Sequence, residues 1–327
     1  MSAYNIAVLG PIPKDHITTH HGEVIEKYGC AMHPTVALSK LLEGEGTVIP
    51  VSHVRKVDEQ PIKKILEKHA NIRLDHITSF RNQGAVINLE FKDQNNRIEK
   101  QTGFMNPIVP EDIKDLLHCD VFVCVPITDY EVPLQTLSYI KDNSDATIIF
   151  DAHGPTNTVT TSGDRHLKFW LDRDIWLPYI DVLKMNLEES HCCWYEKEYE
   201  EMGFGHFDNR STDHLPGFAE YVLERGVKAL IVTLDEQGGA LFYKKDGKIV
   251  ADRTKAIRVN HVVDTTGCGD SFAGGLGFGL LEDSSDYHGA IKYANALGAQ
   301  RTQGKTFDVF KSKKDTDQMI KDHYGEI

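Results

Sequence analysis

A glycine-rich run around position 270 holds the residues whose types and spacing could do chemistry. Six of the 26 glycines lie between Gly267 and Gly279, although glycine costs a helix roughly 1 kcal/mol per residue relative to alanine. Successive N–H groups at Gly267, Cys268 and Gly269 could bind an anion where a helix begins, since the helix dipole adds positive potential there. Asp270 would place a carboxylate beside that anion, which suits a phosphoryl-transfer site that also removes a proton. A tight turn with a capping aspartate is the structural alternative.

Composition limits the partners of such a site. The 327 residues carry a formal net charge of −13, which disfavours nucleic acid as a partner. No stretch approaches the roughly 18 consecutive apolar residues of a membrane span, and the first residues lack a signal-peptide pattern. The six cysteines form no CxxC pair, which fits a reducing cytosol. We therefore expect a soluble cytoplasmic protein that acts on a small molecule.

Alternating short apolar runs and longer amphipathic runs must position the site. Pro34, Pro61 and Pro110 fall near expected helix starts, where the missing N–H of proline costs nothing. The alternation predicts an α/β protein with a mainly parallel sheet covered on both faces. The expected strands are 6–9, 47–51, 121–125, 147–150, 182–184, 229–233 and 240–243. The expected helices are 34–42, 61–69, 110–117, 132–141, 215–225, 272–281 and 287–301.

Two stretches depart from this alternation. Residues 16–28 and 84–102 predict β-hairpins, which would pair into a small separate sheet. Such a sheet would be a discontinuous lid, at about 16–28 and 80–104, that either covers a cleft or forms a homodimer contact. Polar, poorly periodic segments at 153–176 and 191–213 are expected to be insertions beside the fold.

Several segments, in the same order along the chain, resemble motifs of the ribokinase (pfkB) family of carbohydrate kinases. The most specific is Asp264-Thr265-Thr266-Gly267-Cys268-Gly269-Asp270, which is similar to the C-terminal signature of the family. The others are Gly10–Asp15, Tyr28–His33, Asn186–Glu189, Thr233–Ala240 and Ala294–Ala299. The resemblance implies a single ribokinase-like domain over residues 1–327, with three α/β/α layers and a small β lid. It also implies transfer of the ATP γ-phosphoryl group to a substrate hydroxyl.

The resemblance assigns roles to the reacting groups. Asp270 would be the general base that accepts the proton of the attacking hydroxyl. The backbone of Gly267, Cys268 and Gly269 would stabilise charge on the transferring oxygens. The sugar-like substrate would be bound by a separate set, namely Asp15, Gly29 and His33.

The resemblance also implies a donor site. Thr233, Gly238 and Asn295 would border the ATP. Asn186 and Glu189 lie three residues apart on one helical turn and would act on Mg²⁺ through water. The same pair also predicts a capping box, and both roles can hold at once.

Other positions bear on cations and on the substrate. Asp264 and Thr266 resemble the monovalent-cation loop of the family, in which K⁺ would stiffen the glycine run; an ordinary strand end is the alternative. Tyr28 stands where the family has glycine and His33 where it has asparagine, so the substrate pocket is expected to differ. We also expect the thiol of Cys268, at a helix N-terminus, to have a lowered pKa and to be alkylated preferentially.

The identity of the acceptor stays open at this point. An unphosphorylated sugar is the leading expectation, and a nucleoside or a sugar phosphate is the alternative within the same fold. From a different class, a non-catalytic nucleotide- or sugar-binding regulatory protein is also compatible with the fold, although the intact glycine run and Asp270 weigh against it.

Overall fold

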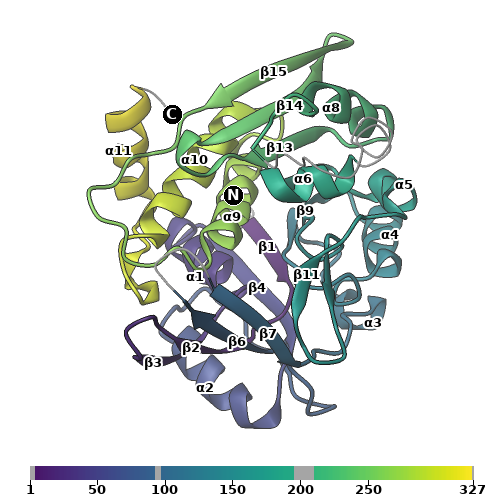
Figure 1. The fold of residues 1–327 in the computed structure, drawn as a ribbon. Coiled ribbons are helices and arrows are strands. Elements are labelled where there is room, and N and C mark those ends of the chain that lie inside the picture. The colour runs from purple at the N-terminus through teal and green to yellow at the C-terminus, as the bar shows by residue number, and fades with distance from the viewer. Residues whose placement is uncertain (1–3, 93–96, 195–209, 326–327) are drawn as a thin grey trace.

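A nine-stranded sheet forms the centre of the protein (Figure 1). This computed structural model describes residues 4–92, 97–194 and 210–325. All neighbours from β13 to β5 run parallel, whereas β14 and β15 are added antiparallel at one edge. The strands, in spatial order, are β15 (Lys248–Thr254), β14 (Gly239–Lys245), β13 (Ala229–Thr233), β12 (Val182–Asn186), β9 (Thr147–Asp151), β8 (Val121–Cys124), β1 (Tyr4–Leu9), β4 (Gly46–His53) and β5 (Ile77–Thr78). The prediction of a mainly parallel sheet is therefore confirmed.

Helices cover both faces of this sheet (Figure 1). In β1, Ile6 and Val8 belong to one apolar core, whereas Ala7 and Leu9 belong to the other, because successive side chains of a strand point to opposite faces. The first core is covered by α1 (Met32–Leu41), α2 (Lys56–Leu66), α9 (Cys268–Glu282), α10 (Tyr287–Arg301) and α11 (Lys313–Tyr324). The second is covered by α3 (Pro110–Ile113), α4 (Leu134–Asn143), α5 (Arg173–Trp176), α6 (Leu187–Cys193) and α8 (Leu215–Glu224). Short 3₁₀ turns lie at η1 (Leu177–Tyr179), η2 (Asp235–Gln237) and η3 (Phe307–Val309).

The glycines of α9 allow it to pack very closely on α10. A Cβ on Gly275 would lie 2.5 Å from the Cα of Ala294, and a Cβ on Gly279 would lie 2.3 Å from the Cα of Ala290. Close packing between helices, rather than intrinsic propensity, therefore accounts for these glycines. The helix begins at Cys268, earlier than the expected start at 272.

The two predicted hairpins do form a small separate sheet. Its strands are β2 (Lys14–Thr18), β3 (Val24–Tyr28), β6 (Val86–Phe91) and β7 (Arg97–Gly103), in the order β3-β2-β6-β7. The hairpins join through parallel pairing of β2 with β6, over a small apolar cluster of Ile17, Ile87 and Leu89. The use of this small sheet as a lid or a dimer contact stays a prediction.

Part of the first expected insertion is ordered against the small sheet. Strands β10 (Asn157–Val159) and β11 (Arg165–Leu167) form a hairpin, and Asp164 makes a β-bridge with Lys100 of β7. Much of the second expected insertion, residues 195–209, lies outside the described residues. Within the described residues, no helix is both long and apolar enough to cross a membrane.

Candidate active site

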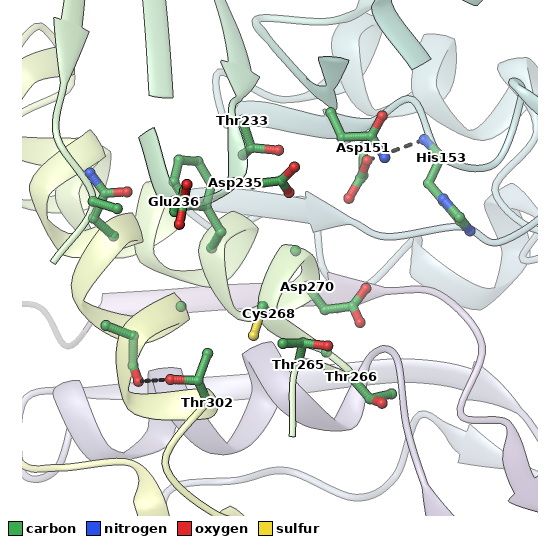
Figure 2. A pocket seen from close by; sticks show the side chains of 18 of the residues that line it. Asp151, His153, Thr233, Asp235, Glu236, Thr265, Thr266, Cys268, Asp270 and Thr302 are labelled. Carbon is green, nitrogen blue, oxygen red and sulfur yellow. Dashed lines mark hydrogen bonds between the residues drawn. The ribbon is translucent and has the colours of Figure 1, made fainter. Parts of the chain in front are cut away.

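The carboxyl ends of the parallel strands border a cavity of about 1470 Å³. Asp151, Asn186 and Thr233 are the last residues of β9, β12 and β13, and all three line this cavity. Figure 2 shows Asp151 and Thr233 across the cavity from Cys268 and Asp270 at the start of α9. Open α/β sheets commonly bind ligands at this edge, so the glycine run and the strand ends form one candidate site.

Gly267 shapes the backbone that leads into α9. Its φ of 84° lies in the left-handed region, which glycine adopts without strain. A Cβ at this position would also lie 2.2 Å from Cδ2 of His33. The N–H of Cys268 donates to the carbonyl of Thr265 at 3.2 Å, so this expected anion donor also serves a turn. Gly267, Cys268 and Gly269 all line the cavity, as expected for a backbone anion site.

Asp270 lies in the first turn of α9 and reaches the cavity. Burial raises the pKa of its carboxyl group to about 6, and the nearby charge of Asp151 adds to this. The thiol of Cys30 donates to Oδ1 of Asp270 at 3.6 Å, and burial keeps that thiol protonated by raising its pKa well above the ordinary range. Asp270 is thus mostly ionised near neutral pH, with a basicity suited to accepting a proton.

A buried ion pair lies beside the glycine run. Nζ of Lys184 is 2.6 Å from Oδ2 of Asp151, and both side chains are only 5% exposed. The same ammonium is 3.0 Å from the position that a Cβ on Gly269 would occupy. Burial alone would lower the pKa of Lys184, but Asp151 and Glu189 raise it, so the amine stays protonated. A fixed positive charge therefore lies beside the expected anion site.

Asn186 and Glu189 form the capping box that opens α6. The N–H of Glu189 donates to Oδ1 of Asn186, and the N–H of Asn186 donates to Oε2 of Glu189, each at 2.8 Å. Oε1 of Glu189 accepts from Nδ1 of His153 at 2.8 Å. Both carboxylate oxygens are thus engaged, although both residues line the cavity. This donor set would fit Mg²⁺ only through water, since Mg²⁺ retains much of its hydration, and the Mg²⁺ role of the pair stays a prediction.

The small sheet brings Asp15 to the cavity. Asp15 lies on β2, is 4% exposed and lines the cavity. A Cβ on Gly29 would lie 2.5 Å from Oδ2 of Asp15, so glycine is needed for this close approach. The structure therefore brings Asp15 and Gly29 together, as the resemblance implied.

His33 and Asp264 lie behind the glycine run and not along the cavity. His33 is 1% exposed, and Nε of Arg301 donates to its Nδ1 at 3.1 Å. Burial, followed by the charge of Arg301, holds the pKa of His33 well below its ordinary value, so the ring is neutral. Oδ2 of Asp264 accepts from Lys27 at 2.6 Å and from Arg301 at 2.8 Å. Thr266, the other residue of the expected K⁺ site, does line the cavity.

The expected nucleotide residues lie together in one part of the cavity, which we call its far end. Thr233, Gly238 and Asn295 all line it, together with the apolar side chains of Ile257 and Val259. Gly238 has a φ of 95°, and a Cβ there would lie 2.0 Å from the carbonyl oxygen of Thr254. The amide of Asn295 donates to the carbonyl of Lys255 at 3.2 Å and to the hydroxyl of Tyr324 at 3.0 Å. This end therefore combines an apolar surface with polar edges.

The expectation of a lowered pKa for Cys268 was wrong. The helix N-terminus was expected to lower the pKa of its thiol, but burial raises it to about 12. The nearby carboxylates of Asp264 and Asp270 add to this effect and offset the charge of Arg301. All six cysteines are free, and Cys268 is partly exposed whereas the other five are buried, so its preferential alkylation stays a prediction.

Sequence reasoning missed several cavity residues that carry charge or can gain it, four of which lie on or beside the parallel strand ends and the β10–β11 hairpin. These four are Asp151, His153, Arg165 and Lys184. Lys184 was detectable, because a lysine inside an otherwise apolar parallel strand (Val182–Asn186) needs a buried partner. Arg165 was not, because it lies in a poorly periodic segment and reaches the cavity through the β10–β11 hairpin.

Comparison with known proteins agrees with this geometry. The family model described as pfkB family carbohydrate kinase matches residues 140–307. The chain is 37% identical over 87 residues to the 2-dehydro-3-deoxygluconokinase of Bacillus subtilis (strain 168), which is 27% of this chain and 25% of that protein. The aligned part thus spans about a quarter of the length of this curated relative.

Two solved structures share the fold over most of the chain. The ribokinase of Arabidopsis thaliana, complexed with ribose and ATP, has a TM-score of 0.71 and 17% identity, and the match covers 98% of this chain and 99% of that chain. A pyrophosphate-dependent kinase in the ribokinase family, complexed with a pyrophosphate analog and myo-inositol, has a TM-score of 0.71 and 15% identity, with 93% and 98% covered.

Proposed function

Because this chain belongs to the pfkB family of carbohydrate kinases, we propose that it transfers the γ-phosphoryl group of ATP to a hydroxyl of an unphosphorylated sugar or sugar-like compound. The observation that carries this proposal is the position of Asp270. Its carboxylate, with a pKa of about 6, lies in the same cavity as the glycine turn at Gly267 and the protonated amine of Lys184.

The reaction follows from this arrangement. The acceptor hydroxyl attacks the γ-phosphorus, its oxygen forms the new P–O bond, and the bond to the bridging oxygen of ADP breaks. Asp270 accepts the hydroxyl proton as attack proceeds, a role typically worth roughly 10²–10⁴-fold in rate. The backbone at Gly267–Gly269 and the ammonium of Lys184 stabilise charge on the transferring oxygens. Mg²⁺ would neutralise the ATP phosphates, with Asn186 and Glu189 contacting its water ligands.

Charge on the side of the small sheet supports an unphosphorylated acceptor. Asp15 and Glu99 present two carboxylates there. Arg165 is the cation beside them, but its side chain is only 4% exposed and is held by Oε1 of Gln101 at 2.7 Å and by the carbonyl of Ile127 at 2.8 Å. Glu99, 3.5 Å from Nε of Arg165, further offsets its charge. These carboxylates would repel a phosphate group carried by the acceptor, whereas they can accept hydrogen bonds from sugar hydroxyls.

The far end of the cavity supports a nucleoside triphosphate as the donor. A purine base could lie against Ile257 and Val259, with Asn295 at its edge. Pyrophosphate, the donor of one structural neighbour, would use none of this surface.

A product screen tests the proposal. Purified protein is incubated with ATP or pyrophosphate and with a panel of sugars, polyols, sugar phosphates and nucleosides, and phosphorylated products are detected by mass spectrometry. We expect ATP-dependent product from an unphosphorylated sugar or polyol, and a loss of at least a hundredfold in Asp270→Asn. Asp246→Asn, at an exposed turn, is the matched control and should retain full activity.

The other outcomes of the screen are decisive as well. If no member of the panel yields a phosphorylated product, a non-catalytic binding protein would be favoured. Turnover of sugar phosphates or nucleosides alone would reject the acceptor class, and turnover with pyrophosphate alone would reject the donor. Equal activity in Asp270→Asn would remove Asp270 as the base.

A further inference from the structure

A buried cluster of charges lies behind the glycine run. Nζ of Lys27 and Nη2 of Arg301 donate to Oδ2 of Asp264, at 2.6 and 2.8 Å. The N–H of Thr266 donates to Oδ1 of the same carboxylate at 2.9 Å. The side chain of Arg301 is 1% exposed, and those of Lys27 and Asp264 are 16% and 18% exposed. Both oxygens of Asp264 are thus engaged, and the cluster holds two positive charges against one negative charge.

This cluster does not fit the K⁺ expected at Asp264 and Thr266. A bound metal cation needs oxygen atoms that face it, but the oxygens of Asp264 already accept from N–H donors. A further cation would also lie beside the charges of Lys27 and Arg301, which would repel it. Although burial would raise the pKa of Asp264, Lys27 and the backbone of Thr266 hold it well below its ordinary value, so the carboxylate stays charged for its two internal cations.

We propose that Lys27 and Arg301 take the place of a monovalent cation, so that the loop before the glycine run is held without K⁺. The two side chains come from different parts of the fold. Lys27 lies on β3 of the small sheet, and Arg301 is the last residue of α10. Their contacts with Asp264 join both elements to the segment that leads into α9.

Arg301 extends this support to the glycine turn itself. Besides Asp264, its guanidinium contacts Nδ1 of His33 at 3.1 Å and the carbonyl oxygen of Gly304 at 2.5 Å. The His33 ring lies directly behind Gly267, where a Cβ would collide with it. Arg301 therefore positions the turn through His33 and the preceding loop through Asp264. Lys27 and Arg301 act as positioning residues, since neither lines the cavity.

The first experiment compares salts. Thermal unfolding and phosphoryl transfer are measured in KCl and in tetramethylammonium chloride at equal ionic strength. For the natural chain we expect less than a twofold difference in kcat/KM and a Tm difference within about 1 °C. A tenfold or greater activation by K⁺, or a Tm raised by several degrees by K⁺ alone, would overturn the proposal. The activity arm rests on the proposed function; the thermal arm does not, so the two can fail separately.

The second experiment removes one internal cation. In tetramethylammonium chloride, Lys27→Met should lower kcat/KM at least tenfold and lower the Tm, and KCl should restore part of both losses. Lys305→Met is the matched control, because Lys305 also pairs with the small sheet, at Glu23, but across an exposed contact of 3.4 Å. A Lys27→Met chain that behaves like Lys305→Met, or that KCl does not help, would show that this ammonium does not stand in for a metal cation.

Discussion

Replacement of Asp270 by asparagine is expected to stabilise the fold while it removes the proposed general base. The pKa of this carboxyl group rises from 3.8 to about 6 in the folded protein. One pH unit corresponds to about 1.4 kcal/mol, so ionising Asp270 costs the folded state about 3 kcal/mol at neutral pH. The carboxylate is partly exposed to the cavity, and screening there reduces the expected gain of Asp270→Asn to on the order of 2 kcal/mol.

The pH dependence gives this prediction its sign. Because the pKa of Asp270 is higher in the folded state, Asp270 is protonated in both the folded and the unfolded chain below about pH 4. Asp270→Asn should then have the same free energy of unfolding as the natural chain. The gain should grow between about pH 4 and pH 6 and stay constant above that range. Urea unfolding at pH 4.5, 6 and 8 measures it, with Asp246→Asn as the exposed control. A destabilised variant at pH 8, or a gain that is the same at every pH, would refute the electrostatic reasoning.

Four further predictions rest on described contacts. The kcat/KM of the natural chain should fall about tenfold per pH unit below about pH 6, where Asp270 becomes protonated; a flat profile down to pH 5 would contradict its role. Lys184→Met should lower the free energy of unfolding in urea by about 3 kcal/mol because it leaves Asp151 buried and unpaired. The double variant with Asp151→Asn should recover most of this loss, and additive losses in the double variant would contradict the reasoning. Gly267→Ala should lower the free energy of unfolding by at least about 2 kcal/mol, because its backbone is left-handed and a Cβ would clash with His33. Gly247→Ala, with a φ of 75° and open space around it, should lower it by only about 1 kcal/mol. Equal losses in the two variants would exclude the clash. Cys268 in the folded protein should react with iodoacetamide at pH 8 roughly a thousandfold more slowly than in urea, because a rise in pKa from 9.0 to about 12 lowers its thiolate fraction by about that factor. Comparable rates by peptide mass mapping would show that it is not shielded.

The parallel strands and the small sheet were predictable because they rest on local patterns. Short runs rich in Val and Ile favour buried strands, and the alternation of apolar and polar residues within 16–28 and 84–102 indicated hairpins directly. By contrast, β15 (Lys248–Thr254) is a mostly exposed edge strand and α11 (Lys313–Tyr324) a largely polar helix. Both have few apolar residues, so neither stood out as an apolar run and both were missed.

The site was predictable where one short motif builds it and not where distant residues meet. The turn at Gly267 and the proposed base, Asp270, lie within one run, so their proximity follows from the sequence. The partners of Asp264 come from β3 and from the end of α10, and only the tertiary structure brings their side chains to its carboxylate. The pKa of Cys268 illustrates the same limit, because burial outweighs the helix dipole and is not visible in a local motif.

The pairing of β2 with β6 has a consequence for the order of folding. These strands run parallel from Lys14 opposite Val86 to Thr18 opposite Glu90, and α1, β4, α2 and β5 lie between them in the sequence. Each hairpin can close on its own, but their junction must wait until this intervening stretch is compact, since closing a long loop carries an entropic cost. We therefore expect Asp15 to reach its final surroundings only after this intervening stretch has folded.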